Sequence, residues 1–380
     1  MIRLHGVRRL GAGGLSKPQS MELQAEGDPI ERDAAGLILS PGWIDLHAHL
    51  RDPGFPDSET LVTGAASAAA GGFTHVLAMA NTDPVADQPE SVRSLLERAA
   101  TMPVRISTVG AFTRQLRGQL LTDAASLRQA GAVALSDDGR HAMDLSVLTR
   151  GLRAAAVAGI PVLVHGQRES LGKDPSAEAA GVEEALSALA DAPGARLHLQ
   201  HVSTRRAVEL LAAAKHSGLS VTAEATPHHL ALTLADVSSS DPNVSPPLRS
   251  ADDRDAIVEG LSDGVIDIIA TDHAPHSAAA KAAGANGYHG FETAAGVILG
   301  LGLSWPVLHR ALVSGPREIL GLEESHDWIL IDPNEAWTVK PESFQSRGRN
   351  TPFVGRRLRG RVVMTVCRGR VAFEEGVQVG

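Results

Sequence analysis

The sequence predicts an α/β protein, a (β/α)8 barrel of the TIM type with a small β-module formed from both chain termini. Two observations favour this fold class. Between residues 41 and 325, short apolar runs of β type alternate eight times with Ala- and Leu-rich amphipathic stretches, which is the repeat of a parallel βα barrel. Residues 1–40 and 326–380 break this pattern, because they are richer in Gly and Arg and alternate Val and Leu.

The elements follow from these runs in chain order. The eight predicted strands are WIDLHAH, HVLAMANT, VRISTVG, AVALSDDG, PVLVHG, LHLQHVS, VTAEATPHH and DIIATDHAPH. Amphipathic spacing predicts helices between them, for example over residues 89–101, 122–131 and 204–218. Near the C-terminus, GRVVMTVCRGRVAF alternates as a half-buried strand does. We therefore expect two units, a composite β-module of residues 1–40 and 326–380 and a barrel of residues 41–325.

Composition narrows the class of function. The chain has 380 residues, of which 43% are hydrophobic, so it can bury a large core. Its net charge of −9 argues against nucleic acid as a partner. No apolar run reaches the roughly 18–20 residues that cross a bilayer, no signal peptide is evident, and the single Cys367 fits a reducing compartment. We expect a cytoplasmic protein with no membrane partner.

Residues able to do chemistry stand at the ends of the predicted strands. In a parallel barrel, the carboxyl ends of all strands meet on one face, where the active site lies. The polar residues at these ends are His47, His49, Asn81, Asp137, Asp138, His165, His201, Asp272, His273 and His276. The sequence therefore predicts that they converge on one face of the barrel, with His273 in a structural or supporting role.

Several of these residues suit a metal. His47 and His49 are two apart, so both imidazoles point to the same side of a strand and can reach one ion. A lone His-x-His pair is as often a surface pair, but histidines or aspartates at further strand ends favour the metal. Asp272 follows a fully apolar run, where a carboxylate is costly unless it is paired or bound to a cation. Only one of Asp137 and Asp138 can point inward, and the other is expected to cap the strand.

Arg51 and Asn81 have two interpretations each. Arg51 lies two residues beyond His49 and is either a solvated loop arginine or a clamp for a substrate carboxylate, which a guanidinium matches bidentately. Asn81 is either a ligand of the substrate or a turn residue before Pro84. Their position alone leaves both alternatives open.

Taken together, the motifs resemble a known family. PGWIDLHAHLRDPG, AAAGGFTHVLAMANTDP, SDDG, LQHVS, SPPLR, ATDHAPH and RNTPFVGRRLRGRV occur in the order found in dihydroorotases. The resemblance is to the longer bacterial branch (type I, aspartate-bridged) of this amidohydrolase family and runs from about residue 40 to the C-terminus. It implies a barrel with a flanking β-module and a site for one or two zinc ions, with two expected.

The resemblance also implies roles for single residues. His47, His49 and Asp272 would hold one zinc, and His165 and His201 a second, with Asp138 between them. The substrate would be bound by Arg51, Asn81, Ser245, His276 and the backbone of Asn286 and Gly287. Ser245 departs from the family, which usually has Asn there. Related enzymes bridge their metals with a carboxylated lysine, but no lysine occurs between Val104 and Gln167, so an aspartate must take that place.

The implied activity is the reversible cyclisation of N-carbamoyl-L-aspartate to L-dihydroorotate and water in pyrimidine (UMP) biosynthesis. Metal-bound hydroxide would act on the ring, with Asp272 as general acid and base. The alternatives are another cyclic amidohydrolase of allantoinase type, or a weakly active structural partner of aspartate carbamoyltransferase. Arg51 disfavours the first, and the intact set of six ligands disfavours the second. A complex with that transferase and a homo-oligomer both stay open.

Overall fold

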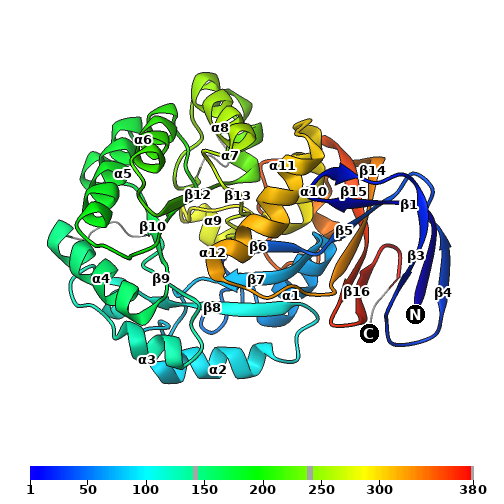
Figure 1. Cartoon of the computed structure of the whole chain (residues 1–380), viewed down its shortest axis with the longest axis horizontal. Helices are drawn as coiled ribbons and strands as arrows, with labels where there is room; N and C mark the ends of the chain where they lie inside the picture. Colours follow the sequence, from blue (N-terminus) through cyan, green and yellow to red (C-terminus); the bar gives the residue numbers. More distant parts are fainter. Residues whose placement is uncertain (140–143, 238–242, 378–380) are drawn as a thin grey trace.

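The main body of the protein is a parallel barrel surrounded by helices (Figure 1). The computed structural model describes residues 1–139, 144–237 and 243–377. The barrel strands pair in chain order and are β6 Trp43–Ala48, β7 Phe73–Ala78, β8 Arg105–Ala111, β9 Ala134–Ser136, β10 Val162–His165, β11 Leu197–Gln200, β12 Val221–Ala225 and β13 Ile268–Ile269. All eight predicted strands are thus confirmed in their predicted order.

Helices cover the outside of the barrel. They are α1 Leu61–Ala70, α2 Pro89–Ala99, α3 Ala124–Gln129, α4 Leu145–Ala158, α5 Pro175–Ala190, α6 Arg205–His216, α7 Pro227–Ala231, α8 Ala251–Asp263, α9 Ala278–Ala282, α10 Phe291–Gly300, α11 Trp305–His309 and α12 Gly315–Leu320. The helices predicted over residues 89–101, 122–131 and 204–218 are α2, α3 and α6. Strands β6, β10 and β11 are buried along their whole length, as parallel strands are when helices cover them.

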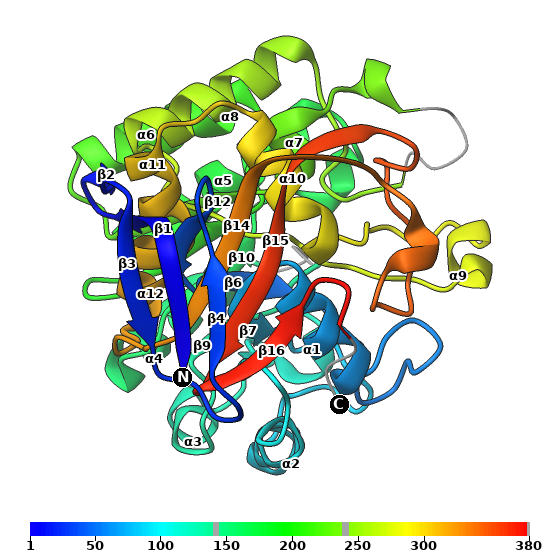
Figure 2. The same ribbon diagram turned by 90° about the vertical axis from the view of Figure 1, so that its right-hand side faces the viewer.

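A second sheet joins the two ends of the chain. Its strands are β1 Ile2–Gly11, β2 Gly14–Leu15, β3 Gln19–Leu23, β4 Ile30–Asp33, β5 Ile38–Pro41, β14 Trp328–Thr338, β15 Arg357–Cys367 and β16 Arg370–Glu374. The order is β16-β15-β14-β5-β1-β2, and both β3 and β4 pair with β1. Figure 2 shows the N-terminal strands next to the C-terminal ones, and the two groups join where β5 pairs with β14. The predicted fold class, a barrel with a β-module from both termini, is confirmed.

The barrel closes where its first strand meets the segment after its last strand. Ala48 forms a parallel bridge with His273, and the His49 N–H donates to the His273 carbonyl at 2.7 Å. Next to this bridge, the buried Asp45 carboxylate accepts hydrogen bonds from the backbone N–H and the hydroxyl of Thr271. This seam lies at the carboxyl ends of the strands, so it sets the positions of the residues that follow β6 and β13.

No helix in the described part of the chain is long and apolar enough to cross a membrane.

Candidate active site

The predicted site residues gather around one cavity of about 210 Å³ at the carboxyl ends of the barrel strands. Its lining is His49, Arg51, Asn81, Asp138, Gly139, His165, His201, Ser245, Asp272, Ala274, His276, Asn286 and Gly287. His47 is the only predicted site residue outside this lining, and it lies fully buried beside it. The cavity is smaller than the roughly 300–1,000 Å³ typical of sites for drug-sized ligands, so it suits a small substrate.

One cluster of possible ligand atoms comes from β6 and the segment after β13. His47, His49 and Asp272 each offer an atom within 4.8 Å of the others. The Asp272 Oδ1 lies 3.2 Å from His49 Nε2 and 3.5 Å from His47 Nε2. Two imidazoles and a carboxylate at this spacing are a donor set that zinc and related divalent metals accept.

A second cluster consists of His47, Asp138 and His201, so it shares His47 with the first. Asp138 Oδ1 lies 3.2 Å from His47 Nε2 and 3.9 Å from His201 Nε2, and its Oδ2 lies 3.3 Å from His49 Nε2. His165 joins through its Nδ1, which is 2.8 Å from His201 Nε2. The structure thus places Asp138 between the two groups of histidines, while Asp137 turns away and accepts from the N–H and hydroxyl of Thr113.

The electrostatics of the cluster favour a cation. Burial raises the pKa of Asp138 and Asp272, but the neighbouring imidazoles, His47 foremost, outweigh it and leave both pKa values below their ordinary value. Burial lowers the pKa of His47, yet Glu224, Asp138 and Asp272 together hold it well above the usual value. Burial and the neighbouring His165 keep the pKa of His201 well below its usual value. Three carboxylates therefore draw positive charge toward His47, and the residues present fit a bound metal.

Glu224 of β12 contacts two of the candidate ligands, His47 and His201, on the side away from the cavity lining. This carboxylate lies 2.5 Å from His47 Nδ1 and 3.0 Å from His198 Nε2, and it accepts from the His201 N–H at 3.2 Å. When a carboxylate holds the Nδ1–H of a histidine, the Nε2 lone pair is left to face the metal. Burial raises the pKa of Glu224, but His47 and His198 overcome it and bring the pKa to about 2. The strand-end pattern does not single out Glu224, although a glutamate within the apolar run VTAEATPHH indicates a buried carboxylate that needs a partner.

Arg51 and His276 meet at the rim of the cavity. The Arg51 Nε donates to the Pro275 carbonyl at 3.3 Å, and its Nη2 lies 3.2 Å from His276 Nε2. The same His276 nitrogen lies 2.7 Å from the Asn286 carbonyl. Burial, with Arg51 next, lowers the pKa of His276 to about 4. A guanidinium and a neutral imidazole therefore face the cavity together and can bind an anionic group.

The other predicted substrate residues also lie at the cavity, with partners of their own. The Asn81 Oδ1 is 2.9 Å from His49 Nδ1, so this amide can orient the imidazole of a candidate metal ligand. The Gly287 N–H donates to the Asn243 carbonyl at 2.9 Å. Gly287 has a φ of 128°, and a Cβ there would lie 2.5 Å from the Ala274 Cβ, which lets the two rim segments approach closely. Ser245 lines the cavity as predicted.

Three site residues have strained backbones. Arg51, His201 and Asp272 adopt positive φ values of 57°, 33° and 46°. Such conformations cost about 1–3 kcal/mol each for a residue other than Gly, and they persist only where the surrounding structure holds them. All three residues line the same cavity. The fold therefore tolerates backbone strain at the positions where it directs these side chains toward the cavity.

The chain is similar over most of its length to proteins named dihydroorotase. A family model described as dihydro-orotase-like matches residues 36–179. A protein of Anaeromyxobacter dehalogenans named dihydroorotase is 44% identical, with 90% of this chain and 88% of that protein covered. Another of the same name, from Thermus aquaticus, is 40% identical over 98% of this chain and 99% of that protein.

Solved structures show the same fold in other enzymes. The L-hydantoinase (dihydropyrimidinase) from Arthrobacter aurescens superposes with a TM-score of 0.87 at 24% identity, covering 100% of this chain and 97% of that one. The D-hydantoinase (dihydropyrimidinase) from a Thermus species gives a TM-score of 0.85 at 20% identity, with 100% and 97% covered. At these identities the likeness establishes the barrel with its extra sheet and nothing about the substrate.

Proposed function

The chain belongs to the dihydroorotase family, and from this premise we infer that it catalyses the reversible cyclisation of N-carbamoyl-L-aspartate to L-dihydroorotate and water, a step of pyrimidine (UMP) biosynthesis. The observation that carries the inference is the cavity itself. It joins a cluster of carboxylates and imidazoles to an arginine at the rim, as a small anionic substrate with a reactive amide requires. The two-unit division at residues 40/41 and 325/326, and a cytoplasmic location, are parts of the same proposal.

We propose zinc as the metal, with two ions per chain. His47, His49 and Asp272 would hold one, and His165 and His201 the other, with Asp138 shared between them. When bound, zinc lowers the pKa of water from 15.7 to about 7 and stabilises negative charge on a carbonyl oxygen. The donor set of imidazoles and carboxylates supports this choice.

Residues of the chain transfer the proton and bind the substrate. In ring opening, a water molecule adds to the ring carbonyl carbon, the bond from that carbon to the ring nitrogen breaks, and a carboxyl group and an amide NH2 form; the carboxyl group then releases one proton to solvent and becomes a carboxylate. Asp272 accepts the proton of the water and gives it to the leaving nitrogen. In cyclisation, the substrate carboxylate takes up one proton from solvent, and Asp272 moves the other proton from the nitrogen to the departing water. Arg51, His276 and Asn81 hold the substrate's own carboxylate away from the reacting bond.

The decisive experiment is dihydroorotate ring opening by the purified, zinc-loaded chain. We expect turnover that a chelator abolishes and added zinc restores, and weaker or no turnover with hydantoin or allantoin. Failure to turn over dihydroorotate with metal bound would contradict the proposal for the chain alone. Repeating the assay with aspartate carbamoyltransferase then tests whether a partner is required.

Replacing Arg51 with alanine is expected to weaken substrate binding. The guanidinium faces a group that does not change in the reaction, so its loss should raise KM about 10- to 100-fold while kcat changes less. Arg51→Lys should recover only part of the loss, since lysine lacks the planar fork. Initial rates over a range of dihydroorotate concentrations measure both constants. Arg93→Ala, at an exposed ion pair on α2, is the control; a fall confined to kcat would contradict this role.

Replacing Ser245 with asparagine is expected to improve binding. The side chain of Ser245 lines the cavity but is shorter than the Asn usual in the family and lacks its amide NH2. One added hydrogen bond should lower KM by roughly 2- to 10-fold. The same kinetic measurement applies, with Ser262→Asn on the exposed face of α8 as control. A raised KM in Ser245→Asn would show instead that the cavity needs the smaller side chain.

A further inference from the structure

We propose that Asn350, which belongs to the segment between β14 and β15, is a positioning residue for the substrate-carboxylate site. This inference rests on the function proposed above and extends it to a residue outside the barrel. The segment of residues 344–350, here named the strap, leaves the β-module and runs to the rim of the active site. Asn350 stands at its end and contacts both rim segments, residues 272–276 and 286–289.

The amide side chain of Asn350 connects the two rim segments. Its Oδ1 accepts from the His276 N–H at 2.9 Å, and its Nδ2 donates to the Gly287 carbonyl at 2.8 Å. The Asn350 carbonyl also accepts from the His289 N–H at 2.6 Å. A planar amide offers an acceptor and a donor side by side. It can therefore hydrogen-bond to the N–H of one rim segment and to the C=O of the other at the same time.

These bonds act on residues that face the substrate. His276 and Gly287 both line the cavity. His276 Nε2 lies near both the Asn286 carbonyl and Arg51 Nη2, and a ring nitrogen can donate to the first or accept from the second, but not both. The choice depends on where the His276 backbone and the Asn286–Gly287 segment lie. Asn350 holds both, so it sets the geometry in which Arg51 and His276 meet a carboxylate.

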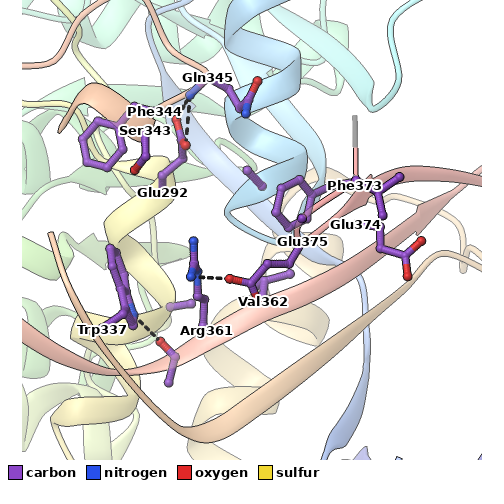
Figure 3. A pocket seen from close by; sticks show the side chains of 15 residues that line it. Glu292, Trp337, Ser343, Phe344, Gln345, Arg361, Val362, Phe373, Glu374 and Glu375 are labelled. Atoms are coloured by element: carbon purple, nitrogen blue, oxygen red, sulfur yellow. Dashed lines mark hydrogen bonds and ion pairs between the residues drawn. The ribbon is translucent and has the colours of Figure 1, made fainter. Parts of the chain in front are cut away.

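The strap is itself firmly anchored on the barrel. The Glu292 carboxylate of α10 accepts from the backbone N–H of Gln345 at 2.9 Å and of Ser346 at 3.2 Å. Figure 3 shows Glu292 joined to Gln345 in this way at the edge of a cavity next to the β-module. The Ser346 hydroxyl donates to Glu59, whose carboxylate also lies 3.4 Å from His273 Nε2. The buried carboxylate of Glu59 and the partly buried one of Glu292 thus fix the strap at Ser346, four residues before Asn350.

Close packing leaves the strap little freedom at its far end. A Cβ on Gly348 would lie 2.4 Å from the Pro275 Cβ and 2.8 Å from the His276 N. The strap therefore lies directly against the segment that carries His276. A side chain on a rigidly held backbone positions its partners more accurately than one on a free loop.

The test compares Asn350→Ala with Asn334→Ala, the same change at an exposed position of β14, where Asn334 accepts only from Arg359 among the contacts described. Loss of both side-chain bonds should raise KM for dihydroorotate about 10-fold, with kcat within roughly 3-fold and the melting temperature close to wild type. Asn350→Asp keeps the acceptor for the His276 N–H and should recover part of the KM. Asn334→Ala should behave as wild type.

Hydrogen exchange of the zinc-loaded protein without substrate supplies a readout that needs no activity. Asn350→Ala should speed exchange of the His276 amide at least 10-fold, while Asn334→Ala leaves it unchanged. Unchanged exchange, or faster exchange with an unchanged KM, would overturn the positioning role. A loss of melting temperature and kcat together, without a change in KM, would indicate a merely structural role and overturn it as well. An inactive wild type with faster exchange in Asn350→Ala would instead refute the proposed function alone.

Discussion

Replacing Asp272 with asparagine should lower kcat about 100- to 10,000-fold, the range that a positioned general acid and base contributes. Asparagine keeps the size of the side chain and an oxygen that can still contact a metal, but it cannot take up or release the proton. Asp272 lines the cavity together with His49, next to the buried His47, and these two imidazoles lower the pKa of Asp272 against the effect of burial. It is therefore ionised and ready to accept a proton from water.

The measurement is kcat for ring opening together with the metal content of the variant. A variant that keeps its metal but loses turnover separates proton transfer from metal binding. Asp272→Ala should lose both, because it removes the oxygen as well. Asp263→Asn, at the exposed end of α8, is the matched control and should be unaffected. A kcat of Asp272→Asn within about threefold of wild type, with metal bound, would exclude Asp272 as the proton carrier.

Replacing Glu224 is expected to have the second-largest effect, on metal affinity and on stability. In Glu224→Gln, the amide oxygen can accept from only one of His47 and His198, and the NH2 group faces the other. The orientation of His47 is therefore expected to change. Loss of such a supporting partner lowers metal affinity about 10- to 100-fold. Glu224→Ala leaves buried polar groups of His47, His198 and the His201 backbone without this acceptor, and should cost about 3–5 kcal/mol of stability.

Titration with a competing chromophoric chelator gives the metal affinity, and denaturant unfolding of the metal-free protein gives the stability. Glu209→Gln, at an exposed position of α6, controls for the loss of one negative charge. Equal metal affinities of Glu224→Gln and wild type would refute the idea that this carboxylate orients His47.

The repeating part of the architecture could be predicted from the sequence because it is local. Each barrel strand is a short apolar run, and a polar residue marks its end. The order of the strands and the positions of the candidate metal ligands can therefore be predicted from residues that are close together in the sequence. The choice between Asp137 and Asp138 as the inward residue needed only the alternation of a strand plus the family's pattern. The structure brings all the predicted site residues to one place.

The supporting contacts could not be predicted in the same way, because they join distant parts of the chain. Glu224 and His47 are 177 positions apart, and Asn350 and His276 are 74 apart. In the sequence, Glu224 is one polar residue in a strand, and Asn350 is part of an extended loop motif. The residues around them do not indicate which distant residue each one contacts. Asn81 is a related case, since only the structure reveals that its oxygen faces His49.

The seam of the barrel has a consequence for the whole molecule. His47 lies on the first strand of the barrel, His49 directly follows that strand and Asp272 follows the last one, so their cluster spans the join at Ala48 and His273. A cation held by all three would link the first and last strands of the barrel, because opening the seam would require these residues to separate. Binding energy at the site would then add to the global free energy of unfolding. The concentration of free metal would then determine the stability of the folded chain as well as its rate of turnover.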